Sequence, residues 1–379
     1  MKIIIDAENT KKQKTGVGYY TYNLIKSLIK VDKENDYELV YWKLRNVQKF
    51  NPFGILPDNI KYKKIRFPYS IYFRLFKMGI KIPFSFFSGK ADVYLFPNFI
   101  VYNLKNKKNI VVIYDVSYLK YPQFSDKKNV EFLTEFVSST VKNASHVITI
   151  SENSKKEIME FYKINQKDIS IVSPSYDHNL YYKREASEIL TVKDKYSITG
   201  QYLLFTSTLE PRKNVENIIK AYLLLPKLIK EQYSLVLAGG KGWQDSKILS
   251  DIKKAQDEGE KVIVTGYVLE EDLPVLYSGA SLFVYPSIYE GFGIPILEAM
   301  ACGIPVITSD NSSMPEVAGK AALYVKAEDV NDIKSKIEEL LTDNKLQEKL
   351  KVENMSQLHK FDWDKSALKL LEVIKKVNE

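Results

Sequence analysis

The sequence predicts an α/β protein with two doubly wound, Rossmann-like parallel-sheet domains. Three observations support this fold class. The chain has 379 residues, and a chain of that length divides into domains of about 150 to 200 residues rather than building one core. Hydrophobic residues make up 45% of the sequence, which is enough to fill both cores. In each half, short β-branched runs alternate with helical patterns, as expected of a parallel sheet covered on both faces.

The first half shows this alternation from its first residues. The predicted buried strands are 2–6, 37–44, 109–119 and 145–151. Apolar residues at helical spacing predict one helix after Gly16 and Gly18 and another over 129–144.

The pattern stops between Ser173 and Gly200, where the sequence is polar and weakly patterned. We therefore predict a change of domain in this stretch. The predicted parts are an N-terminal domain of 1–175, a linker of 176–199, a C-terminal domain of 200–360, and a final stretch of 361–379 whose helix returns to the first domain.

The second half restarts the alternation. Its predicted strands are 201–208, 233–240, 262–268, 281–287, 304–310 and 322–325. Its predicted helices are 213–229, 273–280, 294–303 and 365–377. Sheets of this kind bind ligands at the carboxyl ends of their strands. Because the glycine-rich turns fall at those ends, we expect a ligand site there.

Charge is distributed unevenly along the chain. The net charge is +8 overall, but it is +13 over residues 1–170 and −5 over residues 171–379. Halves of opposite sign suggest domains with different partners. The basic half suits nucleic acid, anionic lipid or a phosphorylated substrate.

Composition also argues against several classes of protein. The single cysteine, Cys302, excludes an internal disulfide framework and fits a reducing compartment. The three histidines lack ligand spacing, so no metal site is expected. The first ten residues have a strand pattern rather than that of a signal peptide. No apolar run reaches the length of about 18 residues that predicts a membrane span.

The stretch "SIYEGFGIPILEAMACGIPVITSD", Ser287 to Asp310, places Glu290 and Glu298 around a glycine-rich turn. Glycines let a backbone approach a ligand closely, and the helix that begins near Pro295 would offer its first N–H groups to a phosphate. Carboxylates accept hydrogen bonds from sugar hydroxyls. Taken alone, however, the two glutamates fit a solvated helix cap with surface charge better.

With its surroundings, this stretch resembles the signature of retaining glycosyltransferases of the GT-B type, glycosyltransferase family 4 (group 1), in a mannosyltransferase-like form. The signature is written here E-GFGIPIL-E. "FTSTLEPRKNVENIIKAY", "LVLAGGKGW", "VIVTGYVLEEDLPVLYSGA" and "MPEVAG" also match, and "TGVGYYTYNLIKSL" and "VVIYDVSYL" match more loosely. The resemblance covers most of the chain and is strongest over 200–320. It implies two domains facing across a cleft, the first for the acceptor and the second for a nucleotide sugar.

The resemblance implies roles for the matching residues. Arg212 and Lys213 would hold the donor diphosphate and stabilise the charge on the departing nucleotide, although "PRKN" alone could equally be a solvated helix start. Glu290 would face the donor sugar. The implied donor-binding residues are Glu298 at the ribose, Phe292, Gly293 and Ile294 through backbone N–H groups, Pro295 beside them, Tyr267 and Val268 beside the base, and Gly16 and Gly18 in a loop over the diphosphate or acceptor. "TGVG" also fits a simple helix-entry turn.

Two positions depart from the family. Where the family often has a His-Asp pair, this chain has Tyr114 and Asp115. A phenol is a poor base at neutral pH, so only Asp115 is kept as a catalytic candidate, for acceptor activation or positioning. Ser207 and Thr208 replace a common glycine and arginine, and Arg212 is expected to supply the missing charge. The acceptor-binding candidates are Tyr114, Tyr118 and Tyr19.

The segment Lys61–Phe87 holds seven basic residues, no acidic residues and many aromatic ones. It could dock on an anionic membrane surface that carries a lipid-linked acceptor. It could instead be a partly buried helix whose basic side chains extend to solvent, and nucleic acid is a third reading. We favour the membrane and expect no nucleic acid partner.

Together these observations predict a retaining, metal-independent hexosyltransferase without a cofactor. It would move a hexose, mannose favoured, from a nucleoside-diphosphate sugar, GDP-mannose favoured, to a hydroxyl of a glycan or lipid-linked acceptor in cell-surface polysaccharide synthesis. The expected location is the cytoplasm, with peripheral contact at the inner face of the membrane. Two alternatives stay open: a GT-B sugar-nucleotide epimerase or phosphorylase, and a non-catalytic nucleotide-sugar-binding protein. A dehydrogenase is disfavoured because no G-x-G-x-x-G follows the first strand.

Overall fold

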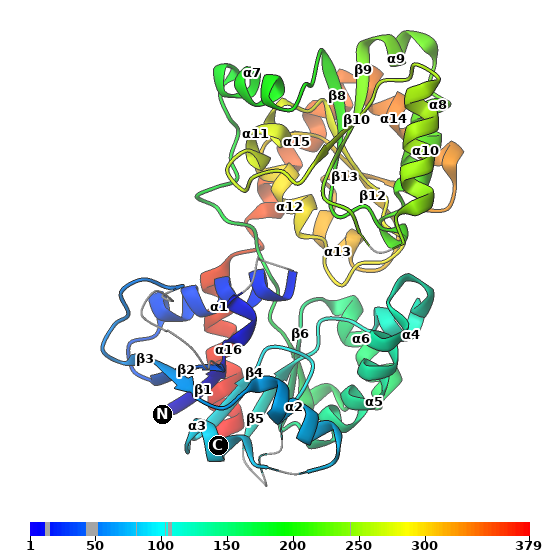
Figure 1. The fold of residues 1–379 in the computed structure, drawn as a ribbon. Helices are drawn as coiled ribbons and strands as arrows, with labels where there is room; N and C mark the ends of the chain where they lie inside the picture. The colour runs from blue at the N-terminus through cyan, green and yellow to red at the C-terminus, as the bar shows by residue number, and fades with distance from the viewer. Residues whose placement is uncertain (12–15, 43–51, 81, 103, 105–107, 243) are drawn as a thin grey trace. The chain divides into compact units, whose positions relative to one another are not determined.

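The chain forms two compact units. The computed structural model describes residues 1–11, 16–42, 52–80, 82–102, 104, 108–242 and 244–379. The first unit contains Met1–Leu119, Lys128–Pro174 and Asp362–Glu379, and the second contains Lys120–Lys127 and Ser175–Phe361. Each unit is built on its own parallel sheet (Figure 1). The predicted fold class, two parallel-sheet α/β domains, is therefore confirmed.

The sheet of the first unit has seven strands in the order β3-β2-β1-β4-β5-β6-β7, and every neighbouring pair is parallel. The strands are β1 (Lys2–Asp6), β2 (Asp36–Trp42), β3 (Ile60–Ile65), β4 (Val93–Phe96), β5 (Asn109–Val112), β6 (His146–Thr149) and β7 (Ile169–Ile171). The central strands are apolar and buried, as sheets covered on both faces require. The strand order reverses between β1 and β4.

Helices from both ends of the chain cover this sheet. They are α1 (Gly16–Val31), α2 (Tyr69–Lys77), α3 (Phe84–Ser88), α4 (Ser117–Lys120), α5 (Lys127–Asn143), α6 (Glu152–Tyr162) and α16 (Trp363–Asn378), with short 3-10 helices at Glu8–Lys11 and Gln166–Asp168. The terminal helix α16 packs on α1, β4 and β5. Its Ser366 hydroxyl donates to the Ser173 carbonyl at 2.6 Å. The last helix of the chain thus belongs to the first unit.

The sheet of the second unit has six strands in the order β10-β9-β8-β11-β12-β13, again all parallel. The strands are β8 (Gln201–Thr206), β9 (Tyr233–Ala238), β10 (Val262–Gly266), β11 (Leu282–Tyr285), β12 (Val306–Ser309) and β13 (Ala322–Val325). The order reverses between the neighbours β8 and β11. In open α/β sheets, ligands bind beyond the carboxyl ends of the strands at such a reversal.

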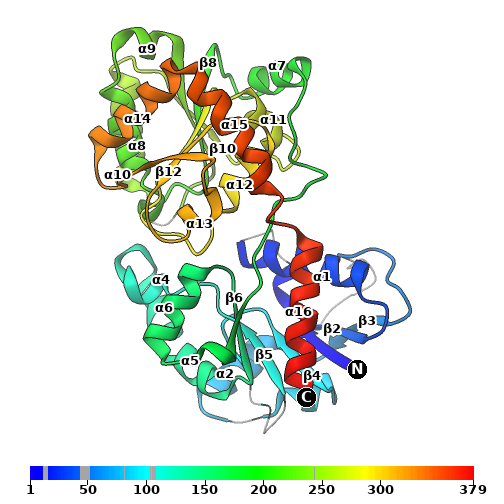
Figure 2. The ribbon, with the colours of Figure 1, turned by 180° about the vertical axis from the view of Figure 1, so that it is seen from behind.

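Two groups of helices cover the opposite faces of this sheet (Figures 1 and 2). Helix α8 packs against α10 and α14, whereas α12 packs against α11 and α15, and α11 against α7. The helices are α7 (Ala186–Lys195), α8 (Val215–Leu223), α9 (Lys227–Gln232), α10 (Ser246–Asp257), α11 (Leu273–Gly279), α12 (Ile294–Ala301), α13 (Met314–Ala318), α14 (Val330–Thr342) and α15 (Asn344–Leu358), with 3-10 helices at Pro122–Phe124 and Pro211–Lys213.

Two predicted elements differ from the observed ones by more than two residues at an end. The helix predicted over 213–229 is interrupted, because Pro226 cannot donate a backbone hydrogen bond and instead begins α9. The strand predicted over 109–119 ends at Val112, and α4 follows within its predicted range. Lys43 and Leu44, predicted to end a strand, lie outside the described residues.

The predicted linker 176–199 differs more, because it carries helix α7 and belongs to the second unit. Glu185 and Glu188 form a capping box at the start of this helix, and Val192 is buried. A single buried apolar residue gives too weak a periodicity to reveal the helix in the sequence. In the described ranges, no helix has the length and apolar character needed to cross a bilayer.

Candidate functional site

Two loops meet at the reversal point of the second sheet. One follows β8 and spans 207–214, and the other follows β11 and spans 286–293. The backbone N–H of Ile288 donates to the Arg212 carbonyl at 2.9 Å. The buried side-chain amide of Asn214 donates to the Pro286 carbonyl at 2.9 Å. These bonds hold both loops at the carboxyl ends of neighbouring strands.

A glycine behind the first loop allows its path. Gly239 follows β9, and an added Cβ there would lie 1.7 Å from the Ser207 carbonyl oxygen. Next to it, the Leu209 N–H donates to the Gly240 carbonyl at 3.0 Å. The "AGG" sequence thus lets the loop after β8 run close against the end of β9.

The loops bring three predicted catalytic residues together. Lys213 Nζ lies 2.6 Å from Glu290 Oε1, and Arg212 Nη1 lies 2.9 Å from Glu290 Oε2. Arg212 Nη2 also pairs with Glu210 Oε1 at 2.8 Å. Lys213 and Glu290 are buried, with 8% and 7% of their surfaces exposed. The result is a buried carboxylate held between two cations.

The charges of this cluster fix its protonation. Burial favours the neutral acid, but the charges of Arg212 and Lys213 outweigh burial and lower the pKa of Glu290 from 4.5 to about 2. Burial lowers the pKa of the Lys213 ammonium, and the charge of Glu290 opposes that shift. A second anion that entered here could take the cations away from Glu290.

Tyr285 completes the cluster from the last position of β11. Its hydroxyl accepts a hydrogen bond from Lys213 Nζ at 3.0 Å and donates one to Glu290 Oε1 at 2.9 Å. The backbone of Glu290 is fixed as well, because its N–H donates to Ser312 Oγ at 3.1 Å and its carbonyl accepts from Ser313 Oγ at 2.9 Å. Both ends of Glu290 are therefore held.

Glu298 occupies a separate buried position on α12. The hydroxyl of Tyr277 donates to Glu298 Oε2 at 3.1 Å and also contacts Thr206 Oγ1 at the end of β8. Burial raises the pKa of Glu298 from 4.5 to about 7, and hydrogen bonds from Tyr277 and Tyr181 oppose this shift. No ion pair is recorded for Glu298 in the described part of the chain.

The turn before α12, residues 291–293, is buried. Gly293 caps the helix with a φ of 113°, a conformation that favours glycine. The Phe292 ring packs edge-on against Phe361 at 5.4 Å, so only its backbone could serve a ligand. Ile294 and Pro295 begin α12. The Ile294 N–H lacks a partner within the helix, whereas Pro295 has no N–H to offer.

Tyr267 and Val268 follow the carboxyl end of β10. Tyr267 is 64% exposed and Val268 is buried. Gly266 directly before them has a φ of 68°. The exposed Tyr267 ring thus lies at the same edge of the sheet as the two loops, two strands away from β8.

The remaining predicted site residues belong to the first unit. Gly16 and Gly18 lie in the first turn of α1 rather than in a loop, which agrees with the simpler helix-entry reading of "TGVG". The ring of Tyr19 packs edge-on against Trp363 at 6.1 Å. Asp115 accepts a hydrogen bond from the Ser117 N–H at 2.8 Å, just before α4.

Tyr114 and Tyr118 are buried in the first unit. The Tyr114 hydroxyl donates to the Pro97 carbonyl at 2.9 Å, and the Tyr118 hydroxyl contacts that of Tyr162. Burial raises the pKa values of both phenols above their ordinary value. In this conformation both hydroxyls are engaged inside the fold.

Residues 191–356 match the family model Glycosyl transferases group 1. The chain is also 30% identical over 386 residues to O-antigen chain mannosyltransferase B of Escherichia coli, covering 99% of this chain and 100% of that protein. The chain belongs to the group 1 glycosyl transferases. The matched range contains Arg212, Lys213, Glu290 and Glu298.

One further relative and one solved structure are also similar to this glycosyl transferase. It is 33% identical over 294 residues to the serotype-specific mannosyltransferase WbdA of Escherichia coli, a match to 75% of this chain but only 35% of that protein. Its fold is similar to that of sucrose-phosphate synthase from Thermosynechococcus elongatus, with a TM-score of 0.75 at 18% identity over 99% of this chain and 98% of that one. That likeness supports the GT-B fold alone.

Sequence reasoning missed the tyrosines of this glycosyl transferase site. Tyr285 and Tyr277 each contact one of the paired glutamates, but neither was predicted. In "SLFVYPS" and "LPVLYSGA" a tyrosine reads as ordinary core. The usable signal is that a buried tyrosine needs a hydrogen-bond partner.

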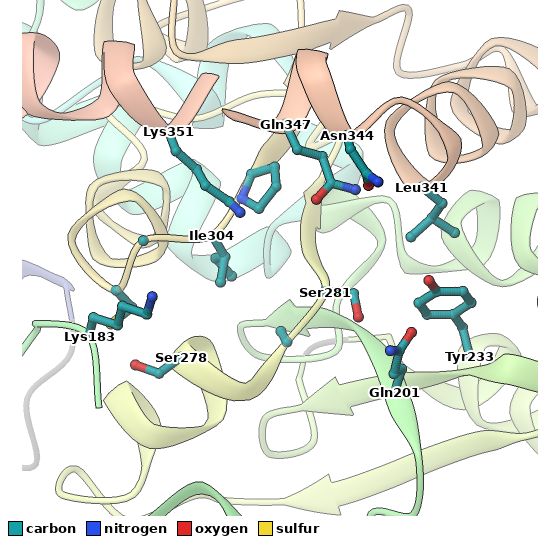
Figure 3. Close-up of a pocket in the computed structure, with 14 residues that line it drawn as sticks. Lys183, Gln201, Tyr233, Ser278, Ser281, Ile304, Leu341, Asn344, Gln347 and Lys351 are labelled. Atoms are coloured by element: carbon teal, nitrogen blue, oxygen red, sulfur yellow. The ribbon is translucent and has the colours of Figure 1, made fainter. Parts of the chain in front are cut away.

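A polar cavity of about 370 Å³ lies elsewhere in the second unit of the glycosyl transferase. Gln201 and Tyr233, at the starts of β8 and β9, line it together with side chains of α15. Figure 3 shows Lys351 pointing from α15 toward Ile304. These strand starts form the edge opposite the two loops, so the cavity is not part of the cluster around Glu290.

Among the residues that the structure describes, no group of three or more His, Cys, Asp and Glu side chains is arranged to hold a metal ion.

Proposed function

We propose that this chain transfers a hexosyl group, with mannose favoured, from a nucleoside-diphosphate sugar to a hydroxyl of a glycan or lipid-linked acceptor. GDP-mannose is the favoured donor, and cell-surface polysaccharide synthesis is the favoured process. The observation that carries the proposal is the Arg212–Lys213 pair facing Glu290 at the reversal point of the second sheet. The names of the two similar Escherichia coli proteins, both mannosyltransferases, support the choice of mannose.

The basic pair suits the departure of a nucleoside diphosphate. When the bond from the anomeric carbon to the diphosphate oxygen breaks, negative charge develops on the diphosphate. Fixed cations in a buried site stabilise that charge without reorganising at the moment of reaction. In the proposed complex, Arg212 and Lys213 therefore exchange Glu290 for the diphosphate.

The two glutamates are proposed to bind different sugars of the donor. Once its cations turn to the diphosphate, Glu290 can accept hydrogen bonds from hydroxyls of the transferred hexose. Glu298 lies on α12, about one turn after the start of that helix. It is proposed to accept hydrogen bonds from the ribose hydroxyls. The acceptor oxygen then bonds to the anomeric carbon and loses its proton, with Asp115 proposed to position or activate it.

Retention and metal independence are further parts of the proposal. Retention means that the acceptor attacks from the face that the diphosphate leaves. Metal independence means that the two cations alone carry the diphosphate charge. Product stereochemistry, read by the anomeric proton coupling of the glycan, and activity in EDTA test the two parts separately.

Thermal stabilisation by nucleotides tests the donor site. GDP, UDP, dTDP and ADP are each added with EDTA present, and a ligand at a hundred times its dissociation constant should add about 2.7 kcal/mol of stability. We expect GDP to stabilise most. GDP-mannose with a mannose-terminated glycan should then yield a longer glycan and GDP. Tight binding without turnover would favour a non-catalytic binding protein, and conversion of donor without acceptor would favour an epimerase.

The segment Lys61–Phe87 is proposed to contact an anionic membrane surface. Ile71, Arg74 and Met78 share one face of α2 and its end, and all three are exposed. Phe86 on α3 is 78% exposed. Tyr72, on the other face of α2, is buried beneath them. Lys81 in this segment lies outside the described residues.

Exposed apolar side chains beside basic ones suit the headgroup region of an anionic bilayer. Flotation with phosphatidylglycerol-containing vesicles tests this contact. We expect binding that weakens in high salt and in the variant Phe86→Ser with Met78→Ser. Leu228→Ser, an exposed residue of the second unit, is the matched control. Equal flotation of all variants would contradict the contact.

A further inference from the structure

We infer that two buried tyrosines, Tyr285 and Tyr277, are positioning residues that each hold one of the paired glutamates for a different part of the donor. Tyr285 orients Glu290 toward the sugar, and Tyr277 orients Glu298 toward the ribose. The inference rests on the proposed function, because that proposal assigns the sugar and the ribose to the two glutamates.

Tyr285 contacts the Glu290 carboxylate through a neutral hydroxyl, whereas Arg212 and Lys213 contact it as cations. Its hydroxyl forms a triangle with Lys213 Nζ at 3.0 Å and Glu290 Oε1 at 2.9 Å. Its ring stacks with Phe205 and Phe283 at 6.1 and 5.5 Å, and only 1% of the residue is exposed. The ring is therefore held in place, and its hydroxyl reaches both Lys213 and Glu290.

This geometry matters when a diphosphate enters. A diphosphate competes with Glu290 for Arg212 and Lys213, because both are cations. It does not compete in this way for the neutral hydroxyl of Tyr285. Tyr285 is thus the partner that can keep Glu290 oriented after its ion pairs have been exchanged, so that a carboxylate oxygen faces the sugar.

Tyr277 serves Glu298 in the same manner, from helix α11. Its hydroxyl contacts Thr206 Oγ1 and donates to Glu298 Oε2 at 3.1 Å. Its ring lies edge-on to Phe283 at 5.3 Å, and the residue has no exposed surface. Phe283 therefore packs against both tyrosines, and Thr206 on β8 fixes the direction of the Tyr277 hydroxyl.

The two roles predict different patterns of ligand binding in the two variants. Tyr285→Phe should leave the affinity for GDP within about threefold of wild type, because both cations remain. The same variant should weaken binding of GDP-mannose and lower kcat by about 10- to 100-fold, the usual effect of losing a hydrogen bond to a charged group. Tyr277→Phe should weaken GDP and GDP-mannose alike, by about tenfold.

Calorimetric titration of GDP and GDP-mannose, with transfer kinetics, measures both patterns. Tyr222→Phe is the matched control, because its hydroxyl donates to the Tyr233 carbonyl, away from both glutamates. It should behave as wild type. In a Glu290→Gln background, Tyr285→Phe should add little further loss, because the two residues act as one unit.

The outcomes separate the inference from the proposed function. Wild type that binds no nucleotide sugar refutes the proposed function and the inference that rests on it. If a nucleotide sugar other than GDP-mannose binds, only the proposed donor is wrong. That nucleotide sugar and its free nucleotide then take the place of GDP-mannose and GDP in the titrations. Wild type that binds donor while Tyr285→Phe loses both ligands equally, or neither, overturns the role of Tyr285. A Tyr277→Phe loss confined to the nucleotide sugar overturns the role of Tyr277.

Discussion

Lys213 Nζ and Glu290 Oε1 lie 2.6 Å apart in an ion pair that is buried from solvent. The two residues are 77 positions apart in the sequence, and they meet because β8 and β11 are neighbours at the reversal of the sheet. A buried ion pair adds little net stability. Its place at the end of these strands is explained more readily by exchange with an anionic ligand.

Removing one member of this pair should cost stability as well as binding. Lys213→Ala leaves Glu290 buried with only Arg212, and breaking a buried pair costs about 3 kcal/mol. We expect a lower urea midpoint and a loss of GDP binding. Lys213→Met with Glu290→Gln removes both charges and should recover most of the stability but not the binding. Recovery of GDP affinity in that double variant would contradict the proposed role of the pair.

Glu290 should contribute stability that is lost in acid. Its folded pKa of about 2 lies below its ordinary value of 4.5, so its contribution is present above pH 4.5 and disappears as the pH falls toward 2. The difference corresponds to about 3 kcal/mol. The free energy of unfolding, measured in urea, should therefore fall less steeply between pH 6 and pH 3 for Glu290→Gln than for wild type. Glu231→Gln, on an exposed side chain, should follow wild type.

Glu298 should make donor binding depend on pH near neutrality, in contrast to the acid range in which Glu290 titrates. Its folded pKa is about 7, and the proposed ribose contact needs the carboxylate. Affinity for GDP-mannose should therefore rise about tenfold between pH 6 and pH 8, and Glu298→Gln should show no such rise. GDP-mannose is the suitable ligand because its diphosphate does not titrate in this range.

The same raised pKa has a consequence for stability. Because the folded state holds the proton of Glu298 more tightly, its contribution is present below pH 4.5 and is lost as the pH rises through 7. Glu298→Gln should accordingly gain stability relative to wild type above pH 7. A parallel course of both proteins from pH 5 to pH 8 would show that Glu298 is not protonated in the folded state.

Gly239 should be indispensable for the loop after β8. A Cβ at this position would lie 1.7 Å from the Ser207 carbonyl oxygen, which is backbone and cannot rotate away. Gly239→Ala should cost at least about 2 kcal/mol and lower GDP affinity as well. Gly240→Ala is the control, because an added Cβ there meets no atom within 4 Å. Equal midpoints for both variants in urea would disprove the close approach.

The fold and part of the site follow from local patterns in the sequence. Strands such as Ile3–Ile5 and Leu203–Phe205 are continuous apolar runs, and the loop glycines mark their ends. The glutamate pair and the basic pair were recognisable because each is a local motif. The convergence of Glu290 with the basic pair was expected from the resemblance and from the position of both loops after parallel strands.

Other features depend on contacts through space that no local pattern encodes. The ion pair of Glu290 with Lys213 requires the register of two strands. The role of Tyr285 in turn requires that Glu290 and Lys213 meet at its hydroxyl. Pro226 interrupts a helix that periodicity alone extends. Helix α7 was read as a linker because it buries little apolar surface. In each case the deciding interaction joins residues that are distant in sequence or too few to form a pattern.

A crystal structure of the protein with GDP tests the central claim, that the donor diphosphate binds between the loops after β8 and β11. We predict diphosphate oxygens within hydrogen-bond distance of Lys213 Nζ and Arg212, with Glu290 displaced from at least one of them and its contact to Tyr285 kept. GDP bound elsewhere, for example in the cavity beside Lys351, with the Lys213–Glu290 pair unchanged, would contradict the claim.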